Sequence, residues 1–216
     1  SYGDVDKIAE LLQMIARREG IGDILARGIK HAAREWDLED IAVHVKGMEP
    51  AGYDPRVLKG MGLAYATSDR GACHLRATFY KPELVGMIPP AQIEGKAALF
   101  LEFEDRLTIF DTLVLCRFYR DLYQWDNLEK IIHALTGLDA GEEALRKRAA
   151  DIATLVRRFN LREGMSKEDE WLSKGFFRKN EKTGDAITPG ELGQMLREYY
   201  LLHGWDENGV PPDDNK

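Results

Sequence analysis

Two cysteines, Cys73 and Cys116, and five histidines are the side chains of this chain best suited to bind a transition metal. Cys73 and His74 lie in the stretch from Gly60 to Arg76, which carries glycines at 60, 62 and 71. Glycine costs backbone entropy, so it is used where backbones pack closely, where φ is positive, or where a ligand leaves no room for a Cβ. The small apolar residues between these glycines predict a buried helical turn against a flat partner.

Cys116 is the strongest candidate ligand. Asp111 lies five residues before it, which is about 140° around an ideal helix, so the two side chains would not share a helix face. The spacing is better explained if Asp111 is the N-cap of a helix and Cys116 lies in its first turns, where the helix dipole favours a thiolate. A thiolate is what iron in an iron–sulfur cluster requires. The alternative is a buried, inert cysteine between Leu115 and Phe118.

The other candidates carry weaker signals. Cys73 is better explained as a small buried residue than as a ligand. The histidines at positions 31, 44, 133 and 203 lack a His-x-x-x-His spacing and are predicted to be structural or exposed. No phosphate-binding loop, dinucleotide-binding unit or nucleophile elbow is found, because Gly60-Met-Gly62 comes before a predicted helix and not after a strand.

Helical periodicity dominates the elements that must position these residues. A short extended segment is expected over 41–46, a linker over 48–52, loops over 81–90 and 174–185, and a frayed tail over 211–216. The pattern therefore predicts an all-α protein. Helices are expected from Asp4 to Gly20, from Asp23 to Ala32, after Asp54-Pro55, over 92–109, 113–123, 127–135 and 141–159, and from Thr188 to Gly204.

Composition narrows the classes of function. The 216 residues carry a formal net charge of −7, which argues against a general nucleic-acid-binding surface. No apolar run approaches the roughly 18–20 residues of a membrane helix, and no leader opens the chain, so no membrane is expected. Two cysteines do not make a disulfide framework, and a reduced cytoplasmic setting is expected.

Four stretches resemble one family. The segment Tyr53–Arg76 closely resembles the C-terminal part of the tungsten-dependent aldehyde ferredoxin oxidoreductases, without gaps. Asp111-Thr-Leu-Val-Leu-Cys116 resembles the family's Asp-x-x-x-Leu-Cys motif, and 159–166 and 199–209 resemble its two C-terminal signatures. The resemblance implies the multihelical fold of that family's C-terminal domains. Residues 1–48 would end the middle helical domain, and residues 49–216 would form the C-terminal helical domain.

The resemblance also implies roles for single residues. Asp111 would bind a pterin ring, and Cys116 would be the fourth ligand of a [4Fe–4S] cluster whose other three cysteines lie upstream of the region seen here. His74 would lie beside the metal as a catalytic residue that hydrogen-bonds or protonates the substrate oxygen, although a hydrogen-bonded structural histidine is an equal alternative. Arg56 could meet an anionic group of the pterin through a bidentate fork, or it could anchor its loop together with Asp54.

The implied reaction converts an aldehyde and water to a carboxylate and passes two electrons through the cluster to ferredoxin. The implied cofactors are a tungsten–bis-pterin and a [4Fe–4S] cluster in the intact enzyme, with neither bound to this chain alone. The implied partners are an N-terminal pterin-binding domain, ferredoxin and the aldehyde, and a homodimer is compatible with the resemblance.

Two alternatives stay open. One is the tungsten subunit of a ring reductase that acts on benzoyl thioesters, from the same superfamily. The other is a non-catalytic helical module or split subunit that docks on a separate catalytic chain.

Overall fold

The structure, a computed structural model, describes residues 3–213. Across those residues the only strand-like pairing is one antiparallel bridge between Val45 and Met48, so the prediction of an all-α protein is confirmed. The elements are α1 (Val5–Arg17), α2 (Ile21–Leu25), α3 (Ile29–Glu35), α4 (Lys59–Thr67), α5 (Tyr80–Leu84), α6 (Lys96–Thr112), α7 (Trp125–Thr136), α8 (Glu142–Arg162) and α9 (Pro189–Leu202), with 3-10 helices η1 (Arg117–Tyr119), η2 (Lys167–Glu170) and η3 (Lys174–Phe177).

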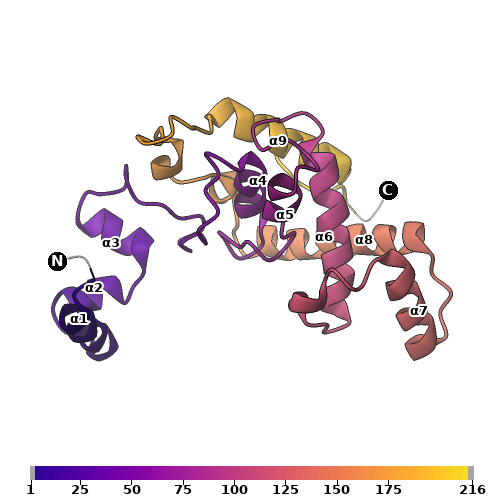
Figure 1. Cartoon of the computed structure of the whole chain (residues 1–216), viewed down its shortest axis with the longest axis horizontal. Coiled ribbons are helices and arrows are strands. Elements are labelled where there is room, and N and C mark those ends of the chain that lie inside the picture. The colour runs from indigo at the N-terminus through magenta and orange to yellow at the C-terminus, as the bar shows by residue number, and fades with distance from the viewer. Residues whose placement is uncertain (1–2, 214–216) are drawn as a thin grey trace.

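The helices fall into two groups (Figure 1). Helices α1–α3 gather at one side of the molecule, and α4–α9 form the larger group, in which α6 packs against α8 and α9, and α9 also packs against α4. The segment between the groups is fastened to the larger one, because Ser173 Oγ accepts a hydrogen bond from the His44 amide at 3.0 Å and Lys46 Nζ donates to the Ala66 carbonyl at 2.7 Å. A domain boundary near residue 48 stays a prediction.

Two apolar clusters hold the larger group together. The first centres on α4 and α9 and is rich in aromatic rings, such as Phe79 and Phe100, which pack edge-to-face with centroids 5.4 Å apart. The second lies between α6, α7 and α8 and includes Phe110 and Leu128, both fully buried. Helix α6 contributes to both clusters and therefore joins them.

Local sequence signals place several helix ends correctly. Asp4 caps α1 by accepting the Lys7 amide at 3.1 Å, and Thr188 and Glu191 form a capping box at the start of α9. Gly137 has φ of +73° and ends α7 as predicted.

Several predicted elements are wrong where tertiary contacts decide. The second helix is split into α2 and α3 at Gly28, and Asp23 binds Arg27 instead of capping a helix. The helix expected after Asp54-Pro55 begins only at Lys59.

Two further corrections concern predicted loops, and a third concerns the predicted tail. The loop over 81–90 contains α5, which tolerates Pro82 because the proline lies in its first turn. The surface loop over 174–185 contains η3, whose Phe176 is buried. Of the tail, Pro211 is buried, and residues 214–216 lie outside the described residues.

The apolar stripe predicted along α8 is only half correct. Leu145 and Ala149 are buried, but Leu155 and Phe159 are 67% and 53% exposed. In the second half of α8 the inward position belongs to Arg157, whose guanidinium pairs with the buried carboxylate of Glu170. The contact face in this half of α8 therefore includes Arg157 and not Leu155 or Phe159.

The glycines of the 60–76 stretch leave space for neighbouring segments of the same chain. A Cβ on Gly60 would overlap the Phe79 ring, and a Cβ on Gly71, where φ is +117°, would lie 2.5 Å from the Val45 carbonyl oxygen. The helical turn between Gly60 and Ala66 is buried in the first apolar cluster. The expected flat partner is therefore replaced by neighbouring segments of the same fold.

A buried ion pair ties α4, α5 and α6 together. Lys96 and Glu83 are both fully buried and bonded to each other, and Glu83 Oε1 also accepts the Gly60 amide at 2.9 Å. Lys96 Nζ donates to the carbonyls of Pro89 and Pro90 at 3.2 and 3.1 Å. Burial raises the pKa of Glu83 and lowers the pKa of Lys96, so each group depends on its partner to stay charged.

Within the described residues, no helix combines the length and the apolar character that crossing a membrane would require.

Removing one partner of the buried pair should destabilise the fold strongly. Lys96→Met leaves the Glu83 carboxylate without its counter-charge, and we expect a loss of about 3–5 kcal/mol in the free energy of unfolding by urea. The matched control is Lys174→Met, which breaks an exposed ion pair with Asp40 and should cost much less, because water screens that pair. Equal losses in the two variants would contradict the role given to the buried pair.

Candidate functional site

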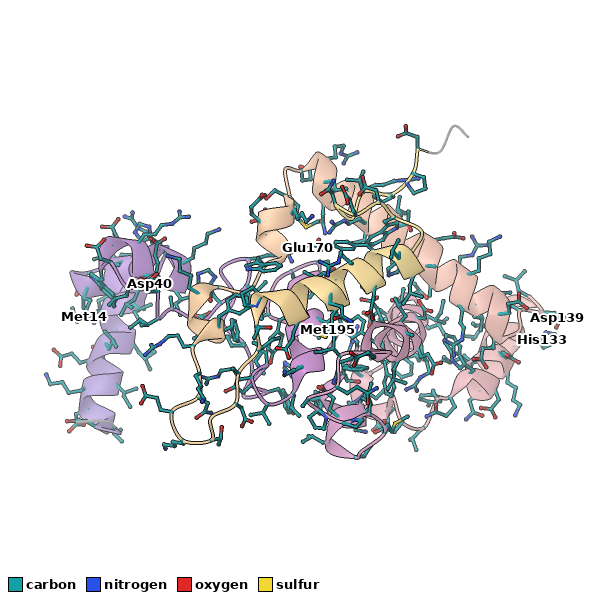
Figure 2. The ribbon with its side chains drawn as sticks, turned by 90° about the horizontal axis from the view of Figure 1, so that it is seen from above. Met14, Asp40, His133, Asp139, Glu170 and Met195 are labelled. Atoms are coloured by element: carbon teal, nitrogen blue, oxygen red, sulfur yellow. The ribbon has the colours of Figure 1, made fainter. Side chains whose placement is uncertain are left out.

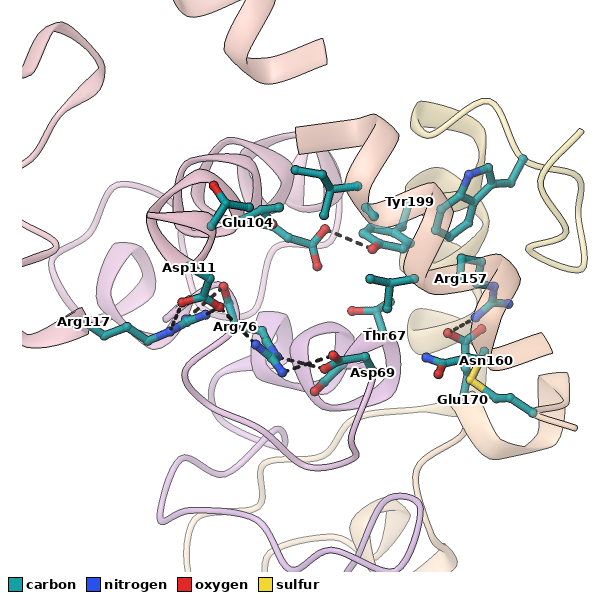
Figure 3. A pocket seen from close by; sticks show the side chains of 18 residues that line it. Thr67, Asp69, Arg76, Glu104, Asp111, Arg117, Arg157, Asn160, Glu170 and Tyr199 are labelled. Atoms are coloured by element: carbon teal, nitrogen blue, oxygen red, sulfur yellow. Dashed lines mark hydrogen bonds and ion pairs between the residues drawn. The ribbon is translucent and has the colours of Figure 1, made fainter. Parts of the chain in front are cut away.

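A cavity of about 320 Å³ opens between α6, α8, α9 and the end of α4 (Figure 3). One wall is charged and polar, and the wall from α8 is mainly apolar. Its size lies at the lower end of the range for small-molecule sites. Among the described residues it is lined by Thr67, Ser68, Asp69, Arg76, Glu104, Thr108, Asp111, Thr112, Arg117, Ile152, Ala153, Val156, Arg157, Asn160, Met165, Glu170, Tyr199 and Trp205.

One face of α6 supplies part of this lining. Glu104, Thr108 and Asp111 follow at i, i+4 and i+7, so they lie in one row along the helix. Asp111 is therefore in the last turn of α6 and does not cap a following helix, which corrects the sequence prediction. No α-helix forms over 113–123 as predicted, because α6 runs on to Thr112 and Val114 then takes a φ of +56°; only the 3-10 helix η1 lies in that span.

Two arginines hold the Asp111 carboxylate (Figure 3). Arg76 Nη1 donates to Asp111 Oδ2 at 3.1 Å, and Arg117 donates to both carboxylate oxygens, to Oδ1 through its Nε at 3.0 Å. Arg76 also forms a bidentate pair with Asp69, at 2.8 and 3.1 Å. Charge-assisted forks of this kind fix orientation, so Asp111 is held in place at one end of the cavity.

Cys116 lies outside the cavity. It precedes η1 and is exposed, as are its neighbours Val114 and Phe118, which are 91% and 89% exposed. The alternative of a buried, inert cysteine is therefore wrong for Cys116. The buried cysteine is Cys73, whose sulfur accepts a hydrogen bond from Arg70 at 3.0 Å.

His74 lies in a separate aromatic group. Its ring centroid is 5.7 Å from that of Tyr53 and 6.4 Å from that of Tyr80, and the two tyrosine rings stack at 4.0 Å. Burial, followed by the positive charges of Arg70 and Arg120, lowers the pKa of His74. The neutral imidazole is therefore favoured at neutral pH.

Arg56 is engaged with its own loop. Its guanidinium forms a fork with Asp54, at 3.0 Å through Nε and 2.7 Å through Nη2, and Nη1 donates to the Arg178 carbonyl at 3.3 Å. Of the four residues singled out from the sequence, only Asp111 lines the cavity; Cys116, His74 and Arg56 do not.

Several cavity residues were missed from the sequence. Tyr199 donates a hydrogen bond to Glu104 at 2.9 Å, and Arg157 pairs with Glu170 on the opposite side (Figure 3). Glu170 also accepts from Tyr200 at 2.5 Å, so this end of the cavity is rigidly bonded. The i, i+7 spacing of Glu104 and Asp111 was the one available signal. The Arg157–Glu170 pair joins distant segments and left no local signal.

The side chains available here fit a cofactor to which other parts of a protein also bind. Among residues 3–213 there is no group of three or more histidine, cysteine or acidic side chains that could hold a metal ion. Cys116 is an exposed thiol that can supply one ligand to a cluster, whereas Asp111 is a half-exposed carboxylate that can accept hydrogen bonds from a ring. These two residues fit the roles implied by the resemblance, each as one part of a larger site.

Comparison with known proteins identifies the family of the chain. The family description "Aldehyde ferredoxin oxidoreductase, domains 2 & 3" matches residues 1–215. The tungsten-containing aldehyde ferredoxin oxidoreductases of Pyrococcus furiosus and Thermococcus kodakarensis are 32% identical over 99% and 98% of this chain. The chain spans 36% of the length of these relatives.

Two more distant similarities support the same fold. The WOR-like subunit of an aliphatic sulfonate oxidoreductase from Pyrococcus furiosus is 27% identical over 99% of this chain and 34% of its own length. A chain of the solved active-site complex BamBC of benzoyl coenzyme A reductase with 1,5-dienoyl-CoA superposes on this chain with a TM-score of 0.71 and 24% identity. The match covers 98% of this chain and 38% of the solved one. Since the family match covers nearly all of the sequence, the protein belongs to the aldehyde ferredoxin oxidoreductase family.

Proposed function

We propose that this chain forms one side of a tungsten–pterin and iron–sulfur site that oxidises aldehydes to carboxylates and passes the electrons to ferredoxin. The observation that carries the proposal is the positions of Asp111 and Cys116 in a chain of this family. The carboxylate is fixed at the end of α6 beside a cavity, and the thiol is exposed five residues later.

The cofactors would supply the two-electron redox chemistry when bound. Asp111 would accept hydrogen bonds from N–H groups of the pterin, and Arg76 and Arg117 would keep that carboxylate oriented. Cys116 would give its thiolate to one iron, and three further thiolates would come from outside this chain.

His74 is proposed to hydrogen-bond the substrate oxygen or exchange a proton with it at a ring nitrogen. The lowered pKa supports this role, because a neutral imidazole can accept a proton. Arg56 would join the cofactor site only by giving up part of its fork with Asp54, so its role as a loop anchor is the better supported one.

Two other proposals need separating from this one. The likeness to the benzoyl coenzyme A reductase complex supports the fold alone, and a ring reductase would act on a benzoyl thioester instead of an aldehyde. A split or non-catalytic module would bind a separate catalytic chain. We also propose ferredoxin as the electron acceptor, a homodimer and a cytoplasmic location.

The intact protein, purified without oxygen, tests the proposal. We expect tungsten and iron in the preparation and aldehyde-dependent reduction of ferredoxin. When a benzoyl thioester and a low-potential electron donor replace the aldehyde, we expect no reduction of the aromatic ring. Activity on the thioester alone would support the ring reductase, and a preparation without tungsten would contradict the proposal.

The two cysteines should behave differently in the intact protein. Cys116→Ala should remove or damage the cluster, because it deletes a ligand. Cys73→Ala should keep the cluster and cost on the order of 1–2 kcal/mol of stability, because Cys73 is buried. Electron paramagnetic resonance of the reduced proteins measures both, and an equal loss of the cluster signal would show that Cys116 is not the specific ligand.

The 216-residue chain on its own should hold neither cofactor. It contains two cysteines, and the buried one is bonded to Arg70, which leaves one exposed thiol where a cubane cluster needs about four ligands. Metal analysis of the anaerobically purified chain should find neither tungsten nor iron in stoichiometric amount. A stoichiometric four-iron cluster would contradict the ligand assignment.

A further inference from the structure

The hydroxyl of Ser68 is a buried polar group without a partner at the wall of the cavity. Ser68 follows α4 directly and is 2% exposed, and its hydroxyl oxygen makes no hydrogen bond to any described residue. Ser68 nevertheless belongs to the lining of the cavity. A hydroxyl that gives up its bonds to water without replacing them is unfavourable, and such groups are uncommon in folded proteins. The hydroxyl therefore marks a place where a polar atom of a ligand is needed.

The main chain of Ser68, in contrast, is fully bonded. Its amide donates to the Ala64 carbonyl at 3.2 Å, and its carbonyl accepts from Lys46 Nζ at 3.0 Å and from the Gly71 amide at 3.3 Å. Lys46 Nζ also donates to the Ala66 carbonyl at 2.7 Å, which fastens the end of α4. The hydroxyl is thus the one polar group of Ser68 left over, on a backbone that is held in place.

Two other hydroxyls of the lining have partners in their own helices. Thr67 donates to the Leu63 carbonyl at 2.9 Å, and Thr112 donates to the Ile109 carbonyl at 2.7 Å. Such bonds are a usual way for threonine to satisfy its hydroxyl in a helix. Ser68 lies one residue beyond α4 with φ of −54° and ψ of +131°, outside the helical conformation, so its hydroxyl does not follow this pattern.

A second side chain of the lining also lacks a partner. Asn160 belongs to α8, and within residues 3–213 its amide group makes no hydrogen bond. In Figure 3, Asn160 and Asp111 lie at opposite sides of the cavity. Ile152 and Val156 of α8 add an apolar surface between polar groups. This combination of polar atoms at the edges and an apolar wall fits a flat heterocyclic ring.

Arg76 connects the Ser68 segment with Asp111. Its Nε donates to Asp69 Oδ1 at 2.8 Å and its Nη1 donates to Asp111 Oδ2 at 3.1 Å. One guanidinium group therefore spans the distance between the residue after Ser68 and the carboxylate proposed to bind the pterin. The side chains of Arg76 and Asp111 are 35% and 36% exposed, whereas Ser68 is buried. A ligand that enters at Asp111 would reach Ser68 in the interior.

We propose that Ser68 and Asn160 are further binding residues for the pterin that Asp111 binds, and that this cavity of about 320 Å³ receives the ring system. The inference deepens the proposed function and rests on it. The Asp111 carboxylate offers acceptors for the N–H groups of the ring. The Ser68 hydroxyl and the Asn160 amide can also donate, so they can bind the oxygen and nitrogen acceptors of the ring. The apolar wall of α8 would contact the face of the ring.

Release of the pterin from the intact protein tests the assignment. Pterin set free during anaerobic incubation is oxidised and measured by its fluorescence, and tungsten is measured in the same samples. Ser68→Ala deletes one hydrogen bond to the ring, so we expect release to be about two- to tenfold faster than from the wild type, the range for one neutral hydrogen bond. Asn160→Leu keeps the size of the side chain and removes its amide, and it should also speed release.

The matched control is Thr136→Val. It deletes a hydroxyl that bonds to the Ile132 carbonyl on α7, and Thr136 is not part of the cavity lining, so release should stay unchanged. A second measurement separates binding from structure. Ser68→Ala should not lower the urea midpoint of the 216-residue chain, because the deleted hydroxyl has no partner among the described residues. A clear loss of stability would show a structural role for the hydroxyl and overturn the inference.

The outcomes distinguish this inference from the proposed function. A wild-type protein without pterin would contradict both. A wild-type protein that holds pterin, together with unchanged release from Ser68→Ala and Asn160→Leu, would contradict the inference alone. If Ser68→Ala does not fold, Asn160→Leu decides: faster release supports the assignment of the cavity to the pterin, and unchanged release overturns it.

Discussion

The fully buried pair of Lys96 and Glu83 is the constraint on which the arrangement of the larger helical group depends. Its atoms reach the start of α4 through the Gly60 amide, α5 through Glu83 itself, and the loop before α6 through the carbonyls of Pro89 and Pro90. A buried charge without a partner is strongly unfavourable, so these segments must come together in one way. The positions of α4 and α6 are thereby fixed relative to each other, and α9 packs on α4 with Met195 (labelled in Figure 2) buried in the same apolar cluster.

Helix α6 transmits that constraint to the candidate site. Its first half is buried against α4 and α9, and its second half packs against α7 and α8. The face left between these contacts carries Glu104, Thr108 and Asp111, so both ends of the cavity are set on one rigid helix. A site on a helix holds its groups at a fixed spacing better than a site on a loop does.

The two carboxylates that α6 presents to the cavity have different partners. Asp111 is held by the guanidinium groups of Arg76 and Arg117. Glu104 accepts a hydrogen bond from the Tyr199 hydroxyl and lies 3.6 Å from His203 Nε2. Cys116 lies on an exposed loop, and among residues 3–213 it belongs to no group of three or more histidine, cysteine or acidic side chains that could hold a metal ion. Membership of the aldehyde ferredoxin oxidoreductase family, of whose relatives this chain spans about a third, is consistent with a site completed from elsewhere.

The sequence by itself determined the all-α class, the family and the ends of the helices with strong local caps, such as Asp4, Gly137 and Thr188. These features follow from contacts within a few residues, which a pattern can reveal. Only the tertiary structure decided that Asp111 ends α6, that Gly60 makes room for Phe79, and that Arg157 displaces the predicted apolar stripe of α8. It also decided that Glu104 on α6 pairs with Tyr199 and His203 of the C-terminal segment. Each of these outcomes depends on a partner far along the chain, and the energy of burying a ring or pairing a charge there exceeds the local preference that a sequence pattern reports.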